Sequence, residues 1–254
     1  MSAKMTEKKG DVLHILRDTL RFHKEMGIAE YPDSQNIQNF LNATNSPGGR
    51  SPSETLAKDG ENGKNSVTFD TLEEEIYACT LCQLSTNSPG RVSGKGKSGC
   101  RLMIVGDYSH QSGSYSKEIL FGREEDAMLW KMMTAIGLGP ETVYVTNSLK
   151  CCPDDPKIID GKCEERCFSF LAREIGAVNP EIICTMGEMP VRGIMGKKDP
   201  LARLRGHFSS YRYQSGKDVP VMPTFHPRFL LKHQEMKKAT WNDLQAIMRR
   251  LDAS

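Results

Sequence analysis

Residues 167–187 read CFSFLAREIGAVNPEIICTMG, and this stretch predicts a helix that leads directly into a buried strand. We expect the helix over residues 164–178. The strand follows at Glu181–Gly187, a short apolar run that ends in glycine. A helix that returns the chain to a new apolar strand is the repeating step of a parallel sheet. The stretch therefore predicts an α/β fold.

The same alternation of strand and helix extends on both sides of this stretch. Further strands are predicted at Arg101–Gly106, Val143–Asn147 and Val219–Thr224, and further helices at residues 124–137 and from about Lys237 to Leu251. Parallel sheets need helices on both faces. We therefore expect a three-layer α/β/α sandwich around a central, mainly parallel four-stranded sheet.

The N-terminal part of the 254-residue chain has a different character. Residues 1–44 show apolar residues at roughly helical spacing, which predicts a helical N-terminal appendage. Residues 45–68 are rich in Ser, Gly, Asn and Lys, which is typical of a flexible linker. Residues 69–254 are then expected to form the α/β domain, with a helix leading into the first cysteines.

Charge, hydropathy and cysteine content indicate the cellular compartment and the kind of partner to expect. The formal net charge of +2 is too small to indicate nucleic-acid binding by bulk charge. No apolar run is long enough for a membrane span, and the start MSAKMTEKKG lacks a signal peptide. We therefore expect a cytoplasmic protein without membrane contact, whose eight cysteines are free thiols and metal ligands rather than disulfides.

Four cysteines have the spacing of a metal site. Cys79 and Cys82 form a CxxC pair, and Cys151 and Cys167 follow after a long gap. Four thiolates from two such pairs suit an iron–sulfur cluster or zinc. Two other cysteines compete for the second pair. Cys152 adjoins Cys151, and Cys163 lies four residues before Cys167 on the predicted helix.

Polar residues stand where the predicted strands end. These positions are Gly106-Asp107, Asn147, Gly187 and His226. In an open parallel sheet, ligands bind beyond the carboxyl ends of the strands. An acid, an amide and an imidazole are therefore expected to converge on one crevice.

Several segments, in the right order, resemble the family 4 uracil-DNA glycosylases, the iron–sulfur branch of that superfamily. The segments ACTLCQL, TNSLKC, CFSFLAREIGAVNPEIICTMG, LRGHF and PTFHPRFLL are similar to successive family signatures and span roughly residues 72–250. The resemblance implies a DNA glycosylase of base excision repair, which hydrolyses the N-glycosidic bond of a flipped uracil.

The resemblance also implies roles for individual residues. Cys79, Cys82, Cys151 and Cys167 would hold a [4Fe–4S] cluster, with zinc as the alternative. Asn147 would read the Watson–Crick edge of uracil. His226 would stabilise the anionic leaving base, and Asp107 would position water near the sugar.

The first family signature differs in this chain. Asp107 stands in place of the usual glutamate and is followed by Tyr108 rather than by a Gly-Pro-Gly run. Leu120 occupies the position of the aromatic residue that stacks on uracil, although Phe121 is adjacent. Leu120, Phe121 and Tyr108 are thus expected to shape the pocket. The differences leave a second hypothesis open, namely a catalytically altered or inactive relative that binds damaged or single-stranded DNA or acts on another lesion.

DNA containing a damaged base is the expected partner, bound by a monomer. Arg205, Arg228 and Lys232 belong to a late cluster of basic residues that would contact phosphates, although a solvated face is the alternative. Phe229 would act as a wedge that fills the space left by the flipped base, with ordinary helix packing as its alternative.

Overall fold

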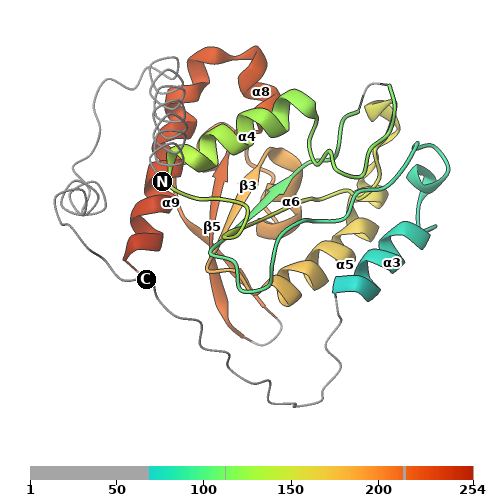
Figure 1. The fold of residues 1–254 in the computed structure, drawn as a ribbon, viewed down its shortest axis with the longest axis horizontal. Helices are drawn as coiled ribbons and strands as arrows, with labels where there is room; N and C mark the ends of the chain where they lie inside the picture. Colours follow the sequence, from blue (N-terminus) through green and yellow to red (C-terminus); the bar gives the residue numbers. More distant parts are fainter. Residues whose placement is uncertain (1–68, 112, 214–215, 254) are drawn as a thin grey trace, which may run out of the picture.

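The computed structural model describes residues 69–111, 113–213 and 216–253, which form an α/β domain (Figure 1). The predicted helical appendage at 1–44 and linker at 45–68 lie outside the described residues. The sheet consists of β1 (Leu102–Gly106), β2 (Val143–Asn147), β3 (Ile182–Met186), β4 (Ser209–Arg212) and β5 (Asp218–Thr224). Its strand order is β2-β1-β3-β5-β4.

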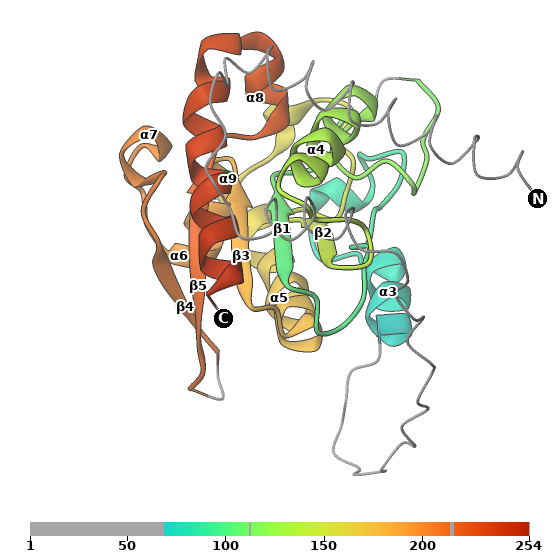
Figure 2. The same ribbon diagram turned by 60° about the vertical axis from the view of Figure 1, so that its left-hand side comes forward.

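Helices cover both faces of the sheet, as the sequence predicts (Figures 1 and 2). Alternate residues of β1 enter different cores, since Leu102 and Ile104 belong to one cluster and Met103 and Val105 to the other. The first core is closed by α4 (Arg123–Ala135), α8 (Pro227–Lys232) and α9 (Lys237–Asp252). The second is closed by α5 (Gly161–Val178) and α6 (Glu188–Met195). The three-layer sandwich is therefore confirmed.

The prediction of four strands is wrong, because β4 adds a fifth strand to the described sheet. It pairs antiparallel with β5 at the edge, while β1, β2, β3 and β5 are mutually parallel. Its residues, Ser-Ser-Tyr-Arg, alternate between partly buried and exposed positions. An edge strand with one solvated face lacks the continuous apolar run that marked the four central strands.

The longer helices follow the sequence closely. Helix α5 begins at Gly161, three residues before the predicted start, because the carboxylate of Asp160 caps it by accepting a bond from Cys163 N at 2.8 Å. The predicted first helix is α3 (Phe69–Ala78), which packs along α5 and leads into the CxxC pair. The short helices α7 (Leu201–Leu204), η1 (Gln83–Ser85), η2 (Pro156–Ile158) and η3 (Gln234–Met236) were not predicted, and neither were α6 and α8.

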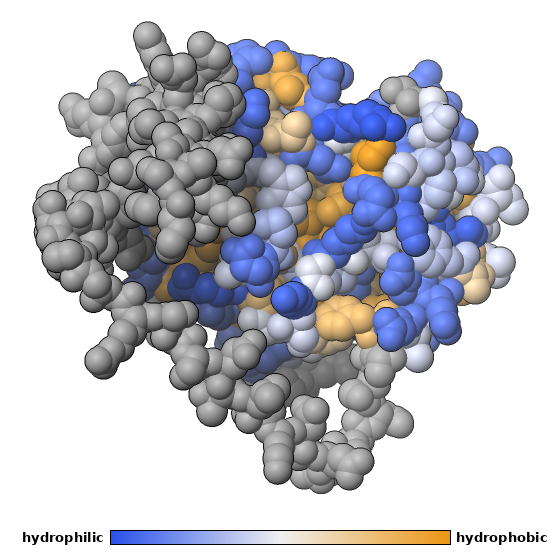
Figure 3. All heavy atoms as spheres, viewed as in Figure 1, coloured by the Kyte–Doolittle hydropathy of each residue, from blue (hydrophilic) through white to orange (hydrophobic). Residues whose placement is uncertain are grey.

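The surface is mostly polar over the face seen in Figure 3, with apolar residues visible in separate patches between hydrophilic ones. Two large hydrophobic side chains of the described residues are exposed, Leu81 within the CxxC pair and Phe229 on α8. None of the described helices is both long and apolar enough to span a bilayer.

Candidate active site

A cavity of about 480 Å³ opens at the carboxyl edge of the sheet. Its lining includes Asp107 after β1, Gly187 after β3, and Phe225 and His226 after β5. Phe229 of α8 also contributes to the wall. The strand-end rule thus brings the predicted acid and imidazole together. Asn147, Leu120, Phe121 and Tyr108 are not among the residues that line this cavity.

The ring of His226 is held in one orientation. His226 caps the N-terminus of α8, where its Nδ1 accepts a bond from Arg228 N at 3.1 Å. Burial, together with the nearby charge of Arg228, lowers the pKa of His226 well below its usual value. The imidazole is therefore neutral at pH 7, and its proton is on Nε2 because Nδ1 accepts. This Nε2 is buried and has no hydrogen-bond partner among the described residues.

Asn147 presents a second buried atom without a partner. Its side chain is only 1% exposed, and its Nδ2 donates to the carbonyl of Leu120. Its Oδ1 has no partner among the described residues. Gly106 makes room for this arrangement. A Cβ at that position would lie 2.8 Å from Asn147 Oδ1 and 2.4 Å from the ring of Phe121.

The loop of the altered first signature is firmly anchored. The Asp126 carboxylate accepts bonds from Leu120 N at 2.8 Å and Phe121 N at 2.9 Å. The ring of Phe121 is fully buried and lies 4.7 Å from the ring of His226. The aromatic neighbour of the imidazole is therefore Phe121, whereas Leu120 contributes its carbonyl to Asn147.

Asp107 lines the cavity directly after β1. Its Oδ1 accepts a bond from Met189 N at 3.3 Å, at the start of α6. Burial raises the pKa of Asp107 to about 6, although the positive charge of Arg228 opposes the increase. Gly187 gives the carboxylate its space, because a Cβ there would lie 2.4 Å from Asp107 Oδ1.

Two of the arginines predicted to contact DNA make bonds within the protein. Arg228 donates to the carbonyls of Tyr108 and Phe121 at 3.2 Å each, and its guanidinium covers the Tyr108 ring at 4.7 Å. Arg205 pairs with Asp243 of α9. Both arginines therefore join elements of the fold, and their DNA contact stays a prediction.

Phe229 and Lys232 are exposed on α8, as a role at a DNA surface requires. Phe229 forms the middle of an aromatic row, 4.9 Å from the ring of Phe225 and 4.2 Å from that of His233. An aromatic row at a cavity mouth offers faces on which bases can stack.

The four predicted metal ligands line one further cavity. Cys79, Cys82, Cys151 and Cys167 all belong to its wall. Burial raises the pKa of Cys151 to about 12 and that of Cys167 to about 11, and the neighbouring thiols add to both increases. Within the described ranges, no three His, Cys, Asp or Glu side chains are placed to hold a single metal ion. Four cysteine thiols are a ligand set that suits either an iron–sulfur cluster or a zinc ion.

The competing cysteines do not line this cavity. Cys152 faces Gln111, whose Nε2 is 3.8 Å from its sulfur. Cys163 is buried near Cys82 but does not line the cavity. Cys100 and Cys184 belong to the two cores of the sheet.

Sequence reasoning missed a buried ion pair between Lys150, which follows β2, and Glu174 of α5. A signal was present, because Glu174 falls among the apolar residues of a predicted helix, and a buried carboxylate needs a partner. The partner could not be read from the pattern, since Lys150 lies 24 residues away.

The fold and this cavity define a class of protein, an α/β/α domain with an acid and a neutral imidazole at the ends of parallel strands. The chain belongs to the uracil DNA glycosylase superfamily, whose family model matches residues 93–245. It is similar to the type-4 uracil-DNA glycosylase of Thermotoga maritima, with 27% identity over 180 residues that cover 70% of this chain and 91% of the relative. The type-4 uracil-DNA glycosylase of Archaeoglobus fulgidus is 26% identical over 184 residues, which cover 71% and 92% of the two chains.

Proposed function

We propose that the protein is a uracil-DNA glycosylase that removes uracil from DNA by hydrolysis of its N-glycosidic bond. One observation carries the proposal. Of the seven buried side-chain atoms without partners among the described residues, Asn147 Oδ1 and His226 Nε2 belong to the amide and the imidazole at the strand ends. Buried polar atoms are normally hydrogen-bonded, so this pair calls for a ligand. Uracil offers the matching groups, because its N3–H donates and its O2 accepts. The names of the relatives agree with this assignment.

The chemistry requires charge to be stabilised at both ends of the bond that breaks. As the bond between C1′ and N1 lengthens, the base becomes negative and the sugar becomes positive. The Nε2–H of His226 donates to uracil O2 and stabilises the negative charge. Asn147 Oδ1 accepts from N3–H and selects uracil by its edge. The Asp107 carboxylate stabilises the sugar and takes the proton of the water that attacks C1′.

The base reaches these atoms through a local rearrangement. Asn147 Oδ1 and His226 Nε2 are covered, and the ring of Phe121 lies next to both residues. The base would therefore enter with a shift of the side chains around these atoms, and the Phe121 ring is placed to stack on the uracil.

A direct assay tests the proposal. Strands containing uracil, hypoxanthine or thymine are incubated with anaerobically purified full-length protein and then treated with alkali, which cleaves at abasic sites. We expect cleavage of the uracil strand and not of the thymine strand. Binding to these strands without cleavage of any would contradict the proposal and favour the inactive relative that the sequence left open.

The four cavity-lining cysteines suit a [4Fe–4S] cluster. Burial raises the pKa of the Cys151 and Cys167 thiols, so the positive charge of bound iron would be needed to hold these two as thiolate ligands. Cys79 and Cys82 follow α3, Cys151 follows β2, and Cys167 lies on α5. When bound, the cluster would supply a structural cross-link between these segments rather than take part in hydrolysis.

Replacing Cys151 by serine is expected to remove the cluster. The variant should lose its brown colour and its absorbance near about 400 nm, together with nearly all bound iron. The thermal unfolding midpoint should fall as well, because the cross-link is lost. Cys100→Ser is the control, since Cys100 belongs to a core of the sheet and does not line the cavity, and it should keep its iron. If the wild-type protein is colourless and holds one zinc ion per chain, the proposal of an iron–sulfur cluster is wrong.

A further inference from the structure

The Lys150–Glu174 ion pair is almost completely buried, with side-chain exposures of 2% and 1%. Two charges taken out of water are expensive, and a pair of apolar side chains in their place is often no less stable. The pair therefore points to a task other than stability. Lys150 lies in the turn between Asn147 of the candidate active site and Cys151 of the cysteine site, and Glu174 lies on α5.

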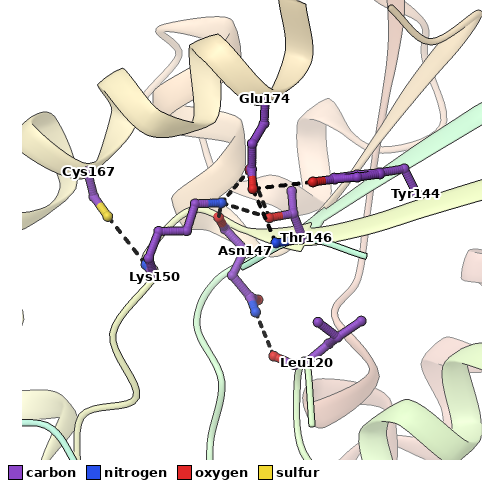
Figure 4. Close-up of polar contacts among 8 residues, drawn as sticks. Leu120, Tyr144, Thr146, Asn147, Lys150, Cys167 and Glu174 are labelled. Atoms are coloured by element: carbon purple, nitrogen blue, oxygen red, sulfur yellow. Dashed lines mark hydrogen bonds and ion pairs between the residues drawn. The ribbon is translucent and has the colours of Figure 1, made fainter. Parts of the chain in front are cut away.

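All three protons of the Lys150 ammonium group are used. Nζ donates to Thr146 Oγ1 at 2.7 Å, to the Asn147 carbonyl at 2.9 Å and to the Glu174 carboxylate (Figure 4). Because an ammonium group has three donors, none remains for water or DNA. All the donors of Lys150 Nζ therefore bind groups within the protein, two of them at the end of β2.

Glu174 connects the hydrogen bonds of Lys150 to other segments of the fold. Its carboxylate also accepts bonds from Thr146 Oγ1 at 2.9 Å, Gly94 N at 3.2 Å and the Tyr144 hydroxyl at 3.4 Å. The carboxylate therefore links α5 to strand β2 and to the segment before β1. A network with every member bonded holds its parts rigidly.

The network holds the end of β2 from which the Asn147 side chain projects. Successive side chains of a strand point to opposite faces, so Thr146 faces α5 and Asn147 faces the other core. Lys150 holds the Thr146 hydroxyl and the Asn147 carbonyl, and the Asn147 carboxamide then extends toward Leu120 (Figure 4).

The same turn contacts two other functional groups. The backbone N–H of Lys150 donates to the sulfur of Cys167 at 3.3 Å, and that of Leu149 donates to the Asp107 carbonyl at 3.0 Å. A displacement of this turn would therefore move the base-reading amide, the acid and a cluster ligand together.

We propose that Lys150 is a positioning residue for base recognition, which acts through Asn147 and, with Glu174, ties its carboxamide to the helix that bears Cys167. The inference rests on the proposed function, because it assigns Asn147 the task of reading uracil. Lys150 itself does not touch the substrate.

A double-mutant cycle tests the proposal with the full-length, iron-containing protein. Single-turnover uracil release is measured for wild type, Lys150→Met, Asn147→Ala and the double variant, well below their unfolding temperatures. Lys150→Met should slow release by about tenfold to a hundredfold when Asn147 is present, because small misplacements of a recognition group are costly. It should change the rate by less than about twofold when Asn147 is already alanine.

Equal slowing in both backgrounds would overturn the proposal, since a merely structural residue lowers the rate whatever stands at position 147. Iron content and the unfolding midpoint are measured for each variant. If Lys150→Met does not fold, Lys150→Met/Glu174→Met removes both charges and takes its place in the cycle. Arg212→Met is the control, because it removes an exposed ion pair with Asp218 and should leave the rate unchanged.

The experiment separates failure of the positioning role from failure of the proposed function. If the wild-type protein releases no uracil, the proposed glycosylase activity is refuted. The cycle is then run on the dissociation constant for DNA containing 2′-fluoro-2′-deoxyuridine, whose glycosidic bond resists hydrolysis. Weaker binding on Lys150→Met only when Asn147 is present supports the positioning role, and equal weakening overturns it.

Discussion

Replacing His226 by alanine is expected to slow uracil release by about 10²–10³-fold, the usual cost of one preorganised donor at a developing negative charge. The imidazole suits this task because burial keeps it neutral, while Arg228 N holds Nδ1 and leaves the proton on Nε2. Binding of uracil-containing DNA should weaken much less, since the charge on the base develops only in the transition state.

Single-turnover rates and dissociation constants of the same preparations measure this prediction. His207→Ala is a matched control, because His207 is exposed and does not line the cavity, and it should retain the wild-type rate. A His226→Ala variant that binds tenfold more weakly yet turns over normally would assign His226 to binding alone.

Asp107→Asn is expected to slow release by about 10²–10⁴-fold and to remove most of the pH dependence of the reaction. The pKa of Asp107 is raised to about 6, so the charged form needed for catalysis predominates above pH 6. The wild-type rate should therefore fall as the pH drops through about 6. The asparagine variant should show a flat profile there, because its side chain does not titrate.

The same raised pKa affects stability in the opposite direction. Between the ordinary value of 3.8 and about 6, the folded protein holds a proton on Asp107 that the unfolded chain releases. Stability from this group is therefore lost as the pH rises through that window, and Asp107→Asn should raise the unfolding midpoint at pH 7. Asp252→Asn, at the exposed end of α9, is the control and should change neither rate nor midpoint. An unchanged pH profile in Asp107→Asn would remove Asp107 from the reaction.

Much of the fold was accessible from the sequence because its central strands are buried on both faces. Such strands appear as continuous apolar runs, and all residues of β1, β2 and β3 are buried. Strand β4 was missed because an edge strand needs no such run. The short helix α8 was missed because six residues carry too little periodicity to be recognised.

The candidate site was predictable in part for a related reason. Parallel strands bring their carboxyl ends to one edge, which is why Asp107 and His226 could be placed in one crevice. The side-chain directions could not be predicted. Asp126 anchors the backbone N–H groups of Leu120 and Phe121, and the ring beside His226 is that of Phe121.

The sequence by itself determined the layered fold, the polar residues at the strand ends and four cysteines with ligand spacing, because these features depend on local pattern and on the order of elements. Only the tertiary structure decided which buried atoms lack partners, which arginines are committed within the protein, and that Lys150 joins Asn147 to Glu174. Those features depend on side chains from distant segments that meet in a low-dielectric interior. There, a polar atom without a hydrogen bond costs free energy, so its partner is either another protein group or a ligand.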